Sequence, residues 1–217
     1  MSAAYPPQPW DLTGRGWVSS WSLSPRARLP QLPAGVAPLG RLALTMFVSY
    51  APPGQMTYAE LLAGVLVRDR AQVGLAITDI WVDSPASRAG GRELWGVPKD
   101  LAEFDLDGAA GPTASEGLLC ARADGRTLAT AAFTASRAPG VPLPLRLPAA
   151  IVQTVPVGPV DAPGARTRWT PISARARALR PARARWSSPA DGPLGWLADA
   201  RSRASILVED FDLRFGS

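Results

Sequence analysis

Short apolar segments separated by prolines and glycines run along almost the whole chain. Segments of this kind are typical of β-strands rather than of long helices. The pattern predicts strands near residues 16–24, 40–50, 62–69, 74–83, 117–123, 127–135, 149–156, 173–185 and 205–215. The proline- and glycine-rich stretches 136–148 and 156–166 predict loops, and neither is long enough to link two domains.

One hairpin is predicted more sharply than the other strand pairs. It covers Leu118 to Ala135, where Asp124 and Gly125 supply a tight turn between two apolar runs. A length of 217 residues fits one domain, and an apolar content of 47% is enough for a core. We therefore predict a single domain over residues 1–217, of the α+β class and mainly antiparallel β, with a few helices.

Two segments are predicted to be helical. The first begins after Ser84, which can cap it, places Pro85 in its first turn and extends to Gly96. Its Gly90-Gly91 pair weakens the helix and indicates that another part of the chain packs closely against it. The second helix is predicted around residues 194–204.

The basic character of the chain comes almost entirely from arginine. The formal net charge is +5, and all but one of the 23 basic side chains are arginine. In a chain so rich in alanine, arginine, glycine and proline we interpret this as a coding bias, which weakens the case for nucleic-acid binding. One stretch concentrates Arg166, Arg168, Arg175, Arg177, Arg180, Arg183 and Arg185. We interpret it as a solvated strand face or a subunit-facing edge and predict no nucleic-acid partner.

The chain carries no sign of secretion or membrane insertion. Residues 1–7 lack both the charged and the apolar region of a secretory signal. No stretch approaches the roughly 18 consecutive apolar residues of a membrane span. The single cysteine, Cys120, cannot form an internal disulfide and does not indicate an oxidising compartment. We therefore expect a cytoplasmic protein with no membrane partner.

The absence of histidine limits the possible chemistry. It excludes Ser-His-Asp and Cys-His catalysis as well as a zinc site that uses imidazole. Cys120 cannot hold a structural metal by itself, and no glycine-rich phosphate loop of the GxxxxGK or GxGxxG kind is present. We predict neither a metal nor a cofactor. Carboxylates, tyrosines, serines, arginines and one amine remain.

That amine belongs to Lys99, which ends the run Gly91-Arg92-Glu93-Leu94-Trp95-Gly96-Val97-Pro98-Lys99. Lysine, unlike arginine, can lose its proton and attack a carbonyl carbon. At an ordinary pKa of about 10.4, less than about a thousandth of a lysine is neutral at pH 7. Burial among apolar neighbours, or a nearby arginine, lowers the pKa of a lysine. We therefore expect a depressed pKa for Lys99 in an apolar pocket.

The segment from Asp83 to Ala102 resembles the signature of the acetoacetate decarboxylase-like superfamily. In that superfamily a Gly-Arg-Glu segment leads through an aromatic and a small residue to Pro-Lys, and the lysine forms a Schiff base. Lys99 falls on this lysine. The resemblance extends more loosely to Tyr5-Pro6-Pro7-Gln8-Pro9-Trp10 and to the C-terminal tail. It implies an acetoacetate decarboxylase-like barrel and a homo-oligomer.

The resemblance also implies roles for further residues. Arg15 coincides with the arginine that contacts the substrate carboxylate, and Glu60 with an active-site glutamate that shuttles protons. Trp95 and Arg92 are candidate substrate-binding residues within the signature. The alternatives are a surface position for Arg15, a salt bridge at a strand start for Glu60, and an ion pair with Glu93 for Arg92.

Two departures from the superfamily's decarboxylases bear on the reaction. Those enzymes carry a second lysine after the Schiff-base lysine, and here that position holds Asp100. By equal spacing back from Glu60, Thr45 stands where they carry a second glutamate. Adjacent side chains of an extended segment point to opposite sides, so we expect Asp100 to face away from the pocket.

The residues together predict a Schiff-base-forming lyase that acts on a keto acid through Lys99. Decarboxylation and related aldolase, dehydratase or cyclase chemistry stay open, although acetoacetate itself is disfavoured as the substrate. The alternative is a non-catalytic, ligand-binding member of the same fold. Tyr50 and Tyr58 are possible proton donors, but nothing in the sequence separates them from core aromatics.

Overall fold

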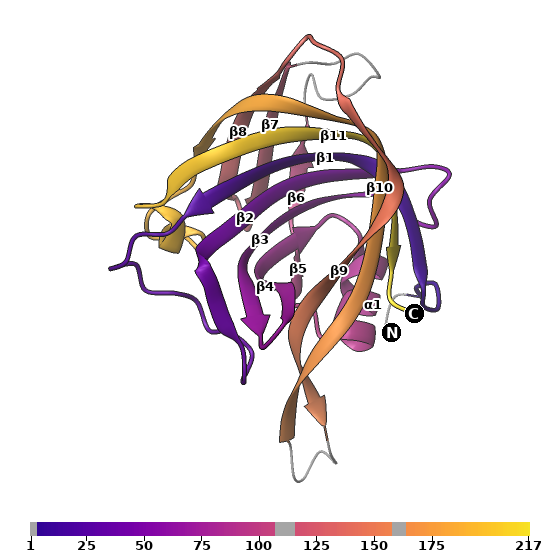
Figure 1. The fold of residues 1–217 in the computed structure, drawn as a ribbon, viewed down its shortest axis with the longest axis vertical. Coiled ribbons are helices and arrows are strands. Elements are labelled where there is room, and N and C mark those ends of the chain that lie inside the picture. The colour runs from indigo at the N-terminus through magenta and orange to yellow at the C-terminus, as the bar shows by residue number, and fades with distance from the viewer. Residues whose placement is uncertain (1–3, 107–115, 158–163) are drawn as a thin grey trace.

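Long, curved β-strands that lie side by side make up most of the fold (Figure 1). The computed structural model describes residues 4–106, 116–157 and 164–217. Its strands are β1 (Trp10–Ser22), β2 (Ala37–Ala51), β3 (Tyr58–Asp69), β4 (Gln72–Val82), β5 (Lys99–Leu101), β6 (Glu103–Asp105), β7 (Glu116–Ala123), β8 (Arg126–Ala135), β9 (Val141–Val157), β10 (Gly164–Ser187) and β11 (Arg201–Phe215). Its helices are α1 (Pro85–Trp95) and the 3₁₀-helix η1 (Gly195–Leu197).

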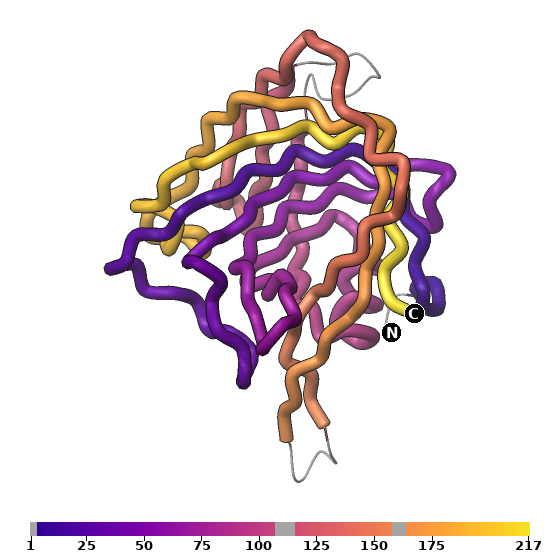
Figure 2. The backbone as a smooth tube through the Cα atoms, in the orientation of Figure 1, coloured from indigo at the N-terminus to yellow at the C-terminus, as the bar shows by residue number. Residues whose placement is uncertain are grey.

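Seven strands form a closed ring because the path of strand pairing returns to its start. β11 pairs with β1, and β2, β3 and β4 follow as antiparallel neighbours. β4 meets β9 in parallel at Leu75 and Ile151, β9 pairs with β10, and β10 pairs with β11. The backbone trace in Figure 2 shows β9 and β10 running together beside the curved strands. The prediction of a mainly antiparallel α+β fold is confirmed.

A second layer covers the outer face of β1 to β4. β10 continues beyond the ring and pairs with β8, and β7 and β6 follow. Apolar residues of this layer pack against Trp17, Phe47 and Trp81 of the ring strands. The predicted hairpin is present as β7 and β8, with Asp124 and Gly125 in the left-handed conformation that a tight turn of this kind requires.

The inner face of the ring is apolar as well. Side chains at alternate positions of β1 to β4 point inward and meet apolar residues of β9, β10 and β11. β3 lies between this interior and the outer layer, so almost every residue from Tyr58 to Val67 is buried. A strand that is covered on both faces reads as a nearly continuous apolar run, which explains the composition of β3.

The helix α1 begins and ends within one residue of its prediction. Ser84 Oγ accepts a hydrogen bond from the backbone N–H of Ser87, and Pro85 occupies the first turn. Gly96 ends the helix at φ 68°, and its N–H donates to the carbonyl of Arg92. No helix of the described residues is long and apolar enough to cross a membrane.

The predicted loop at 136–148 is present only over residues 136–140, and the prediction of a helix at 194–204 is wrong. β9 begins at Val141, because the pairing of its backbone with β10 outweighs the prolines at the start of the strand. The predicted helix shortens to η1, and β11 already begins at Arg201 because β1 and β10 pair with its two edges. The predicted loop 156–166 shrinks at both ends, and residues 158–163 lie outside the described residues. The sequence does not predict the short β5 and β6.

We expect Gly90→Ala to destabilise the protein. An added Cβ would lie 2.5 Å from the ring of Trp10 and 2.8 Å from that of Tyr5. Overpacking of this kind costs about 1–3 kcal/mol, against a gain of at most about 1 kcal/mol in helix propensity. Urea unfolding measures the change in the free energy of unfolding.

The matched control for this substitution is Gly16→Ala. Gly16 is buried in β1, and its added Cβ would meet its nearest neighbours at 3.9 Å, an ordinary contact distance, so we expect a smaller loss of stability. Equal losses for the two variants, or a gain for Gly90→Ala, would contradict the tight contact between Gly90 and Trp10.

Candidate active site

Lys99 lies where the chain turns from α1 back onto β4. Gly96 ends α1, the backbone N–H of Val97 donates to the carbonyl of Gly91 at 3.0 Å, and Lys99 begins β5 opposite Ile80. The lysine stem passes over Gly91, where a Cβ would lie 2.8 Å from Lys99 Cδ. Only 6% of Lys99 is exposed. The glycine therefore provides the space through which the amine enters the interior.

Three oxygen atoms surround the amine. Lys99 Nζ donates to Glu60 Oε2 at 2.8 Å, to Ser87 Oγ at 2.9 Å and to the Tyr58 hydroxyl at 3.5 Å. Glu60 is also buried, and its Oε1 accepts a hydrogen bond from the Tyr50 hydroxyl at 3.2 Å. An ammonium group has three N–H donors, so each finds an acceptor here. The centre of the site is a buried ion pair inside a polar network.

This ion pair reverses the expected pKa shift of Lys99. Burial lowers the pKa of the ammonium, as the sequence predicts. The Glu60 carboxylate and the Tyr58 hydroxyl raise this pKa, and together they outweigh the effect of burial. The pKa therefore lies above the ordinary 10.5, and the ammonium is the resting form. The prediction of a depressed pKa is wrong for this state, because the sequence does not reveal a carboxylate in contact with the amine.

Two tyrosines complete the polar network. Burial raises the pKa of Tyr50 well above 10.0, and the neighbouring Glu60 carboxylate raises it further. Burial also raises the pKa of Tyr58, to about 12. Both phenols therefore keep their protons at neutral pH and can donate hydrogen bonds. The Tyr58 ring also lies 5.1 Å from Lys99 Nζ, a distance at which its face attracts a cation.

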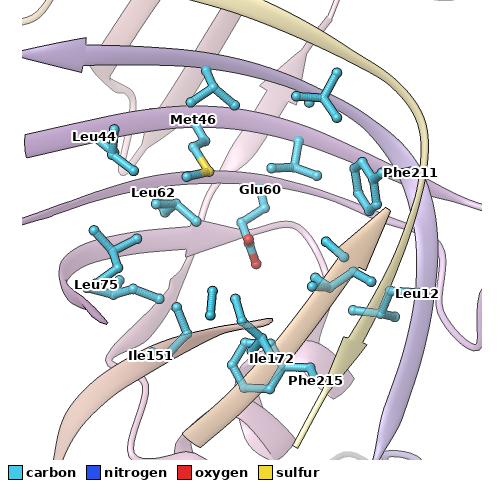
Figure 3. Close-up of a pocket in the computed structure, with 18 of the residues that line it drawn as sticks. Leu12, Leu44, Met46, Glu60, Leu62, Leu75, Ile151, Ile172, Phe211 and Phe215 are labelled. Carbon is cyan, nitrogen blue, oxygen red and sulfur yellow. The ribbon is translucent and has the colours of Figure 1, made fainter. Parts of the chain in front are cut away.

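A cavity of about 500 Å³ opens onto the Lys99–Glu60 pair. Figure 3 shows the carboxylate of Glu60 projecting into it between apolar side chains on both sides. The polar or charged residues of the described lining are Tyr50, Tyr58, Glu60, Lys99 and Arg175. The remaining described lining is apolar or glycine, so the network around the amine stands in an otherwise apolar hollow.

Arg15 lies on the face of β1 that points away from the cavity. Gly16 and Val18 line the cavity, whereas Arg15 does not, although it is buried. The extended backbone of β1 explains this placement, because neighbouring side chains of a strand point to opposite faces. The structure therefore does not bring Arg15 to the amine, and its contact with a substrate carboxylate stays a prediction.

Thr45 also points away from the cavity. Its neighbours Leu44 and Met46 line the cavity, and Thr45 Oγ1 accepts a hydrogen bond from Trp21 Nε1 at 2.9 Å on the opposite face. The interpretation of Thr45 as the replacement of a pocket glutamate is therefore wrong, because counting residues back from Glu60 reaches the outer face of β2.

Arg92 does not line the cavity but joins α1 to β5. Its Nε donates to the Lys99 carbonyl at 2.5 Å, and its Nη2 pairs with Asp100 Oδ1 at 2.6 Å. Arg88 lies 3.7 Å from the same carboxylate oxygen. Asp100 is exposed and faces away from the amine, as predicted. Arg92 therefore fixes the backbone of Lys99, and direct contact with a substrate stays a prediction.

Trp95 lines the cavity beside the amine. It is 1% exposed, and its ring meets that of Trp10 edge-on at 4.6 Å and that of Phe215 at 4.4 Å. Trp95 Nε1 has no hydrogen-bond partner among the described residues. Of the predicted site residues, the structure thus brings Lys99, Glu60 and Trp95 to one cavity.

The arginines of β10 pair with carboxylates of the neighbouring β11. The shortest contacts are Arg175 with Asp212 at 2.6 Å, Arg177 with Asp210 at 2.5 Å and Arg180 with Glu209 at 3.0 Å. This arrangement fits the interpretation of the stretch as a charged strand face. No group of three or more Cys, Asp or Glu side chains in the described part of the chain is placed to hold a metal ion.

Comparison with known proteins identifies the family. A family model described as acetoacetate decarboxylase (ADC) matches residues 1–188. The chain belongs to the acetoacetate decarboxylase family. No curated protein sequence matches it significantly.

Several solved structures share the fold at low sequence identity. Acetoacetate decarboxylase from Legionella pneumophila is 19% identical with a TM-score of 0.76, over 99% of this chain and 87% of that one. An acetoacetate decarboxylase-like enzyme from Sphingomonas wittichii is 16% identical with a TM-score of 0.75, over 96% and 91% of the chains. The enduracididine biosynthesis enzyme MppR in complex with pyruvate is 17% identical with a TM-score of 0.73, over 100% and 91%.

Ser87 is a site residue that the sequence analysis does not single out. It is fully buried, and its Oγ accepts a hydrogen bond from Lys99 Nζ. Ser87 precedes Gly90 and Gly91 by three and four residues, so the three small residues share one face of α1. A face of small residues beside the signature lysine is the signal that could have indicated Ser87, because it leaves room for the lysine stem.

The single lysine allows the protonation of Lys99 to be measured directly. Selective nitrogen-15 lysine labelling gives one Nζ resonance, whose chemical shift follows protonation as the pH changes. In the wild type we expect the midpoint above the ordinary 10.5, because Glu60 stabilises the ammonium. In Glu60→Gln the carboxylate is gone, and burial is then opposed only by the contacts of the amine with Tyr58 and Ser87. Burial is the largest single influence on this pKa, so we expect the midpoint to fall below that of a free lysine.

The matched control for this titration is Glu93→Gln, which makes the same change on the exposed side of α1. It is expected to leave the Lys99 midpoint close to the wild-type value. A wild-type midpoint already below that of a free lysine, or an unchanged midpoint in Glu60→Gln, would contradict the electrostatic role of the ion pair.

Proposed function

We propose that this member of the acetoacetate decarboxylase family is a lyase that forms an imine between Lys99 and a keto acid. The observation that carries the proposal is the buried primary amine at the wall of an apolar cavity, in contact with a carboxylate that can exchange protons with it. The family includes decarboxylases, and MppR, a structural neighbour, is described in complex with pyruvate. The reaction that follows the imine is left open between decarboxylation and aldolase, dehydratase or cyclase chemistry.

The first step of this proposal produces a neutral amine. The proton moves from Lys99 Nζ to Glu60 Oε2 along the 2.8 Å contact between them. A substrate that fills the cavity excludes water, and exclusion of water penalises both charges of the pair. Proton transfer removes both charges at once, so a filled cavity favours the neutral pair. Tyr50 donates to the other oxygen of Glu60 and holds the carboxyl group in place.

The next steps form the imine and release water. The Nζ lone pair attacks the carbonyl carbon, and the carbonyl oxygen takes the proton from Glu60 to give a carbinolamine. Glu60 then accepts a proton from the nitrogen and returns it to the hydroxyl group, which leaves as water. The protonated imine on Lys99 can accept the electron pair released by loss of CO₂, or supply an enamine for bond formation.

One observation favours a second function, that of a non-catalytic ligand-binding protein. The resting Lys99 is an ammonium with three acceptors, and a charged lysine is a poor nucleophile. In this alternative the Lys99–Glu60 pair binds a polar group of the ligand and forms no covalent bond. Reductive trapping separates the two functions.

Borohydride is expected to trap a covalent adduct when the protein is mixed with a reactive keto acid. The reduced adduct adds the mass of the keto acid less one oxygen atom and maps to Lys99 after proteolysis, because no other lysine is present. Lys99→Arg is expected to abolish trapping, since a guanidinium does not lose its proton. Lys99→Met is a second variant that removes the amine without adding a buried charge.

Circular dichroism of both variants confirms that they are folded, and mass spectrometry of the intact protein measures the adduct. The absence of an adduct with every member of a broad keto-acid panel would refute imine formation and leave the ligand-binding alternative. Trapping that persists in both folded variants would show that the reactive amine is the N-terminus instead.

We also propose that the chain forms a homo-oligomer. Support comes from exposed apolar side chains of β9, with Val141 66%, Leu145 74% and Leu147 53% exposed. Large apolar side chains exposed on one strand are candidates for a subunit interface, because association would remove them from water. Sedimentation velocity is expected to give a mass well above the 22.9 kDa of one chain, and Leu145→Glu is expected to weaken the assembly. A monomeric wild type at micromolar concentration would contradict the proposal.

A further inference from the structure

The cavity is much larger than a small keto acid requires. Its volume of about 500 Å³ lies in the range of pockets for drug-sized ligands. At the roughly 30 Å³ that one water molecule occupies in the liquid, the cavity has room for about sixteen non-hydrogen atoms. The six non-hydrogen atoms of pyruvate would fill only about a third of it. A keto-acid head group leaves space for up to about ten further carbon atoms.

The unfilled space extends along the strands away from the amine. On β3 the cavity is lined by Tyr58 and Glu60 near the amine and then by Leu62 and Leu66. A rise of about 3.3 Å per residue places Leu66 some 20 Å along the strand from Glu60. On β4 the lining runs from Ile80, the neighbour of Lys99, to Val73, which is half exposed. The cavity is thus an elongated channel rather than a pocket fitted around the amine.

Outside the network around the amine, the described walls of this channel carry only two groups that could contact a polar part of a substrate, the indole N–H of Trp95 and the guanidinium of Arg175. Arg175 is 52% exposed in its side chain and pairs with Asp212 at 2.6 Å. The polar residues Tyr50, Tyr58 and Glu60 all belong to the network around Lys99. A ligand that fills the channel is therefore polar at the amine and apolar along the rest of its length.

We propose that the substrate is a keto acid with an unbranched apolar chain of about six to ten carbon atoms beyond its keto group. This inference rests on the proposed imine chemistry and names its substrate class. The keto group meets Lys99 and Glu60, and the chain lies along Leu62 and Leu75, to the left of Glu60 in Figure 3. Leu66, further along β3, also lines this part of the channel. The chain replaces water along apolar walls, which supplies the binding free energy.

A homologous series of 2-oxo acids tests this assignment. The probes are pyruvate, 2-oxobutyrate, 2-oxohexanoate, 2-oxooctanoate and 2-oxodecanoate, each mixed below saturation with the wild-type protein and borohydride. Each buried methylene contributes about 0.8 kcal/mol, or roughly a fourfold gain. We expect the apparent second-order rate constant of trapping at Lys99 to rise at least about tenfold from pyruvate to 2-oxooctanoate.

Leu75→Trp tests where the chain lies. Leu75 is buried in β4 and lines the channel away from Lys99, so a tryptophan there shortens the channel. The ratio of the rate constants for 2-oxooctanoate and pyruvate is expected to fall by about tenfold. Leu118→Trp is the matched control, because Leu118 is 59% exposed on β7 and does not line the channel, and it is expected to keep the wild-type ratio.

The outcomes separate this inference from the proposed function. Rate constants that are equal or that fall with chain length refute the apolar-chain substrate and leave imine formation intact. If Leu75→Trp is folded and the ratio of the rate constants for 2-oxooctanoate and pyruvate is unchanged, the placement of the chain along Leu75 is refuted. If Leu75→Trp does not fold, the series of 2-oxo acids with the wild-type protein alone decides whether the substrate has an apolar chain. No adduct with any member of the series refutes imine formation and, with it, this inference.

Discussion

A lysine and a glutamate buried 2.8 Å apart determine what the rest of this structure must provide. Neither charge is tolerable alone at that depth, since an unpaired buried ion costs several kcal/mol. The two side chains come from different strands, Lys99 from β5 and Glu60 from β3, and β4 lies between these strands. The register of three neighbouring strands must therefore hold the pair together. The layer of β6 to β8 covers the outer face of these strands, and α1 with its glycine end sets the start of β5.

Pairing and reactivity oppose one another in this site. The Glu60 carboxylate raises the pKa of Lys99 and keeps the amine charged, whereas nucleophilic attack needs it neutral. The conflict disappears if Glu60 is also the group that accepts the proton, because the same contact then serves both states. The apolar walls of the cavity favour the transfer of the proton from Lys99 to Glu60. A ligand that displaces water from the cavity makes the charged pair more costly and so favours the form in which the amine can react.

The sequence predicts the features that depend on local signals. Ser84, Pro85 and Gly96 define α1 because caps and turn geometry act within a few residues, and Asp124-Gly125 defines the hairpin for the same reason. The face of a strand on which a residue lies depends on where the strand begins, and this is why Arg15 and Thr45 were expected in the cavity but point outward. An ion pair between residues of different strands also cannot be recognised from the residues next to either partner in the sequence. The sequence analysis therefore gives the wrong direction for the pKa shift of Lys99. Glu60 is different, because a single carboxylate in the apolar run of β3 implies a buried partner.

The position of the amine and the shape of the cavity depend largely on different parts of the chain. The position of the amine is set by α1, Gly91 and the start of β5, which together form one short segment. Most of the cavity wall comes from β1 to β4 and from β9 to β11, outside this segment. Side chains on these walls can change the length and polarity of the cavity without moving Lys99, because each projects from a strand whose register is fixed by backbone pairing. The fold can therefore stay the same while the size and polarity of the space beside Lys99 change.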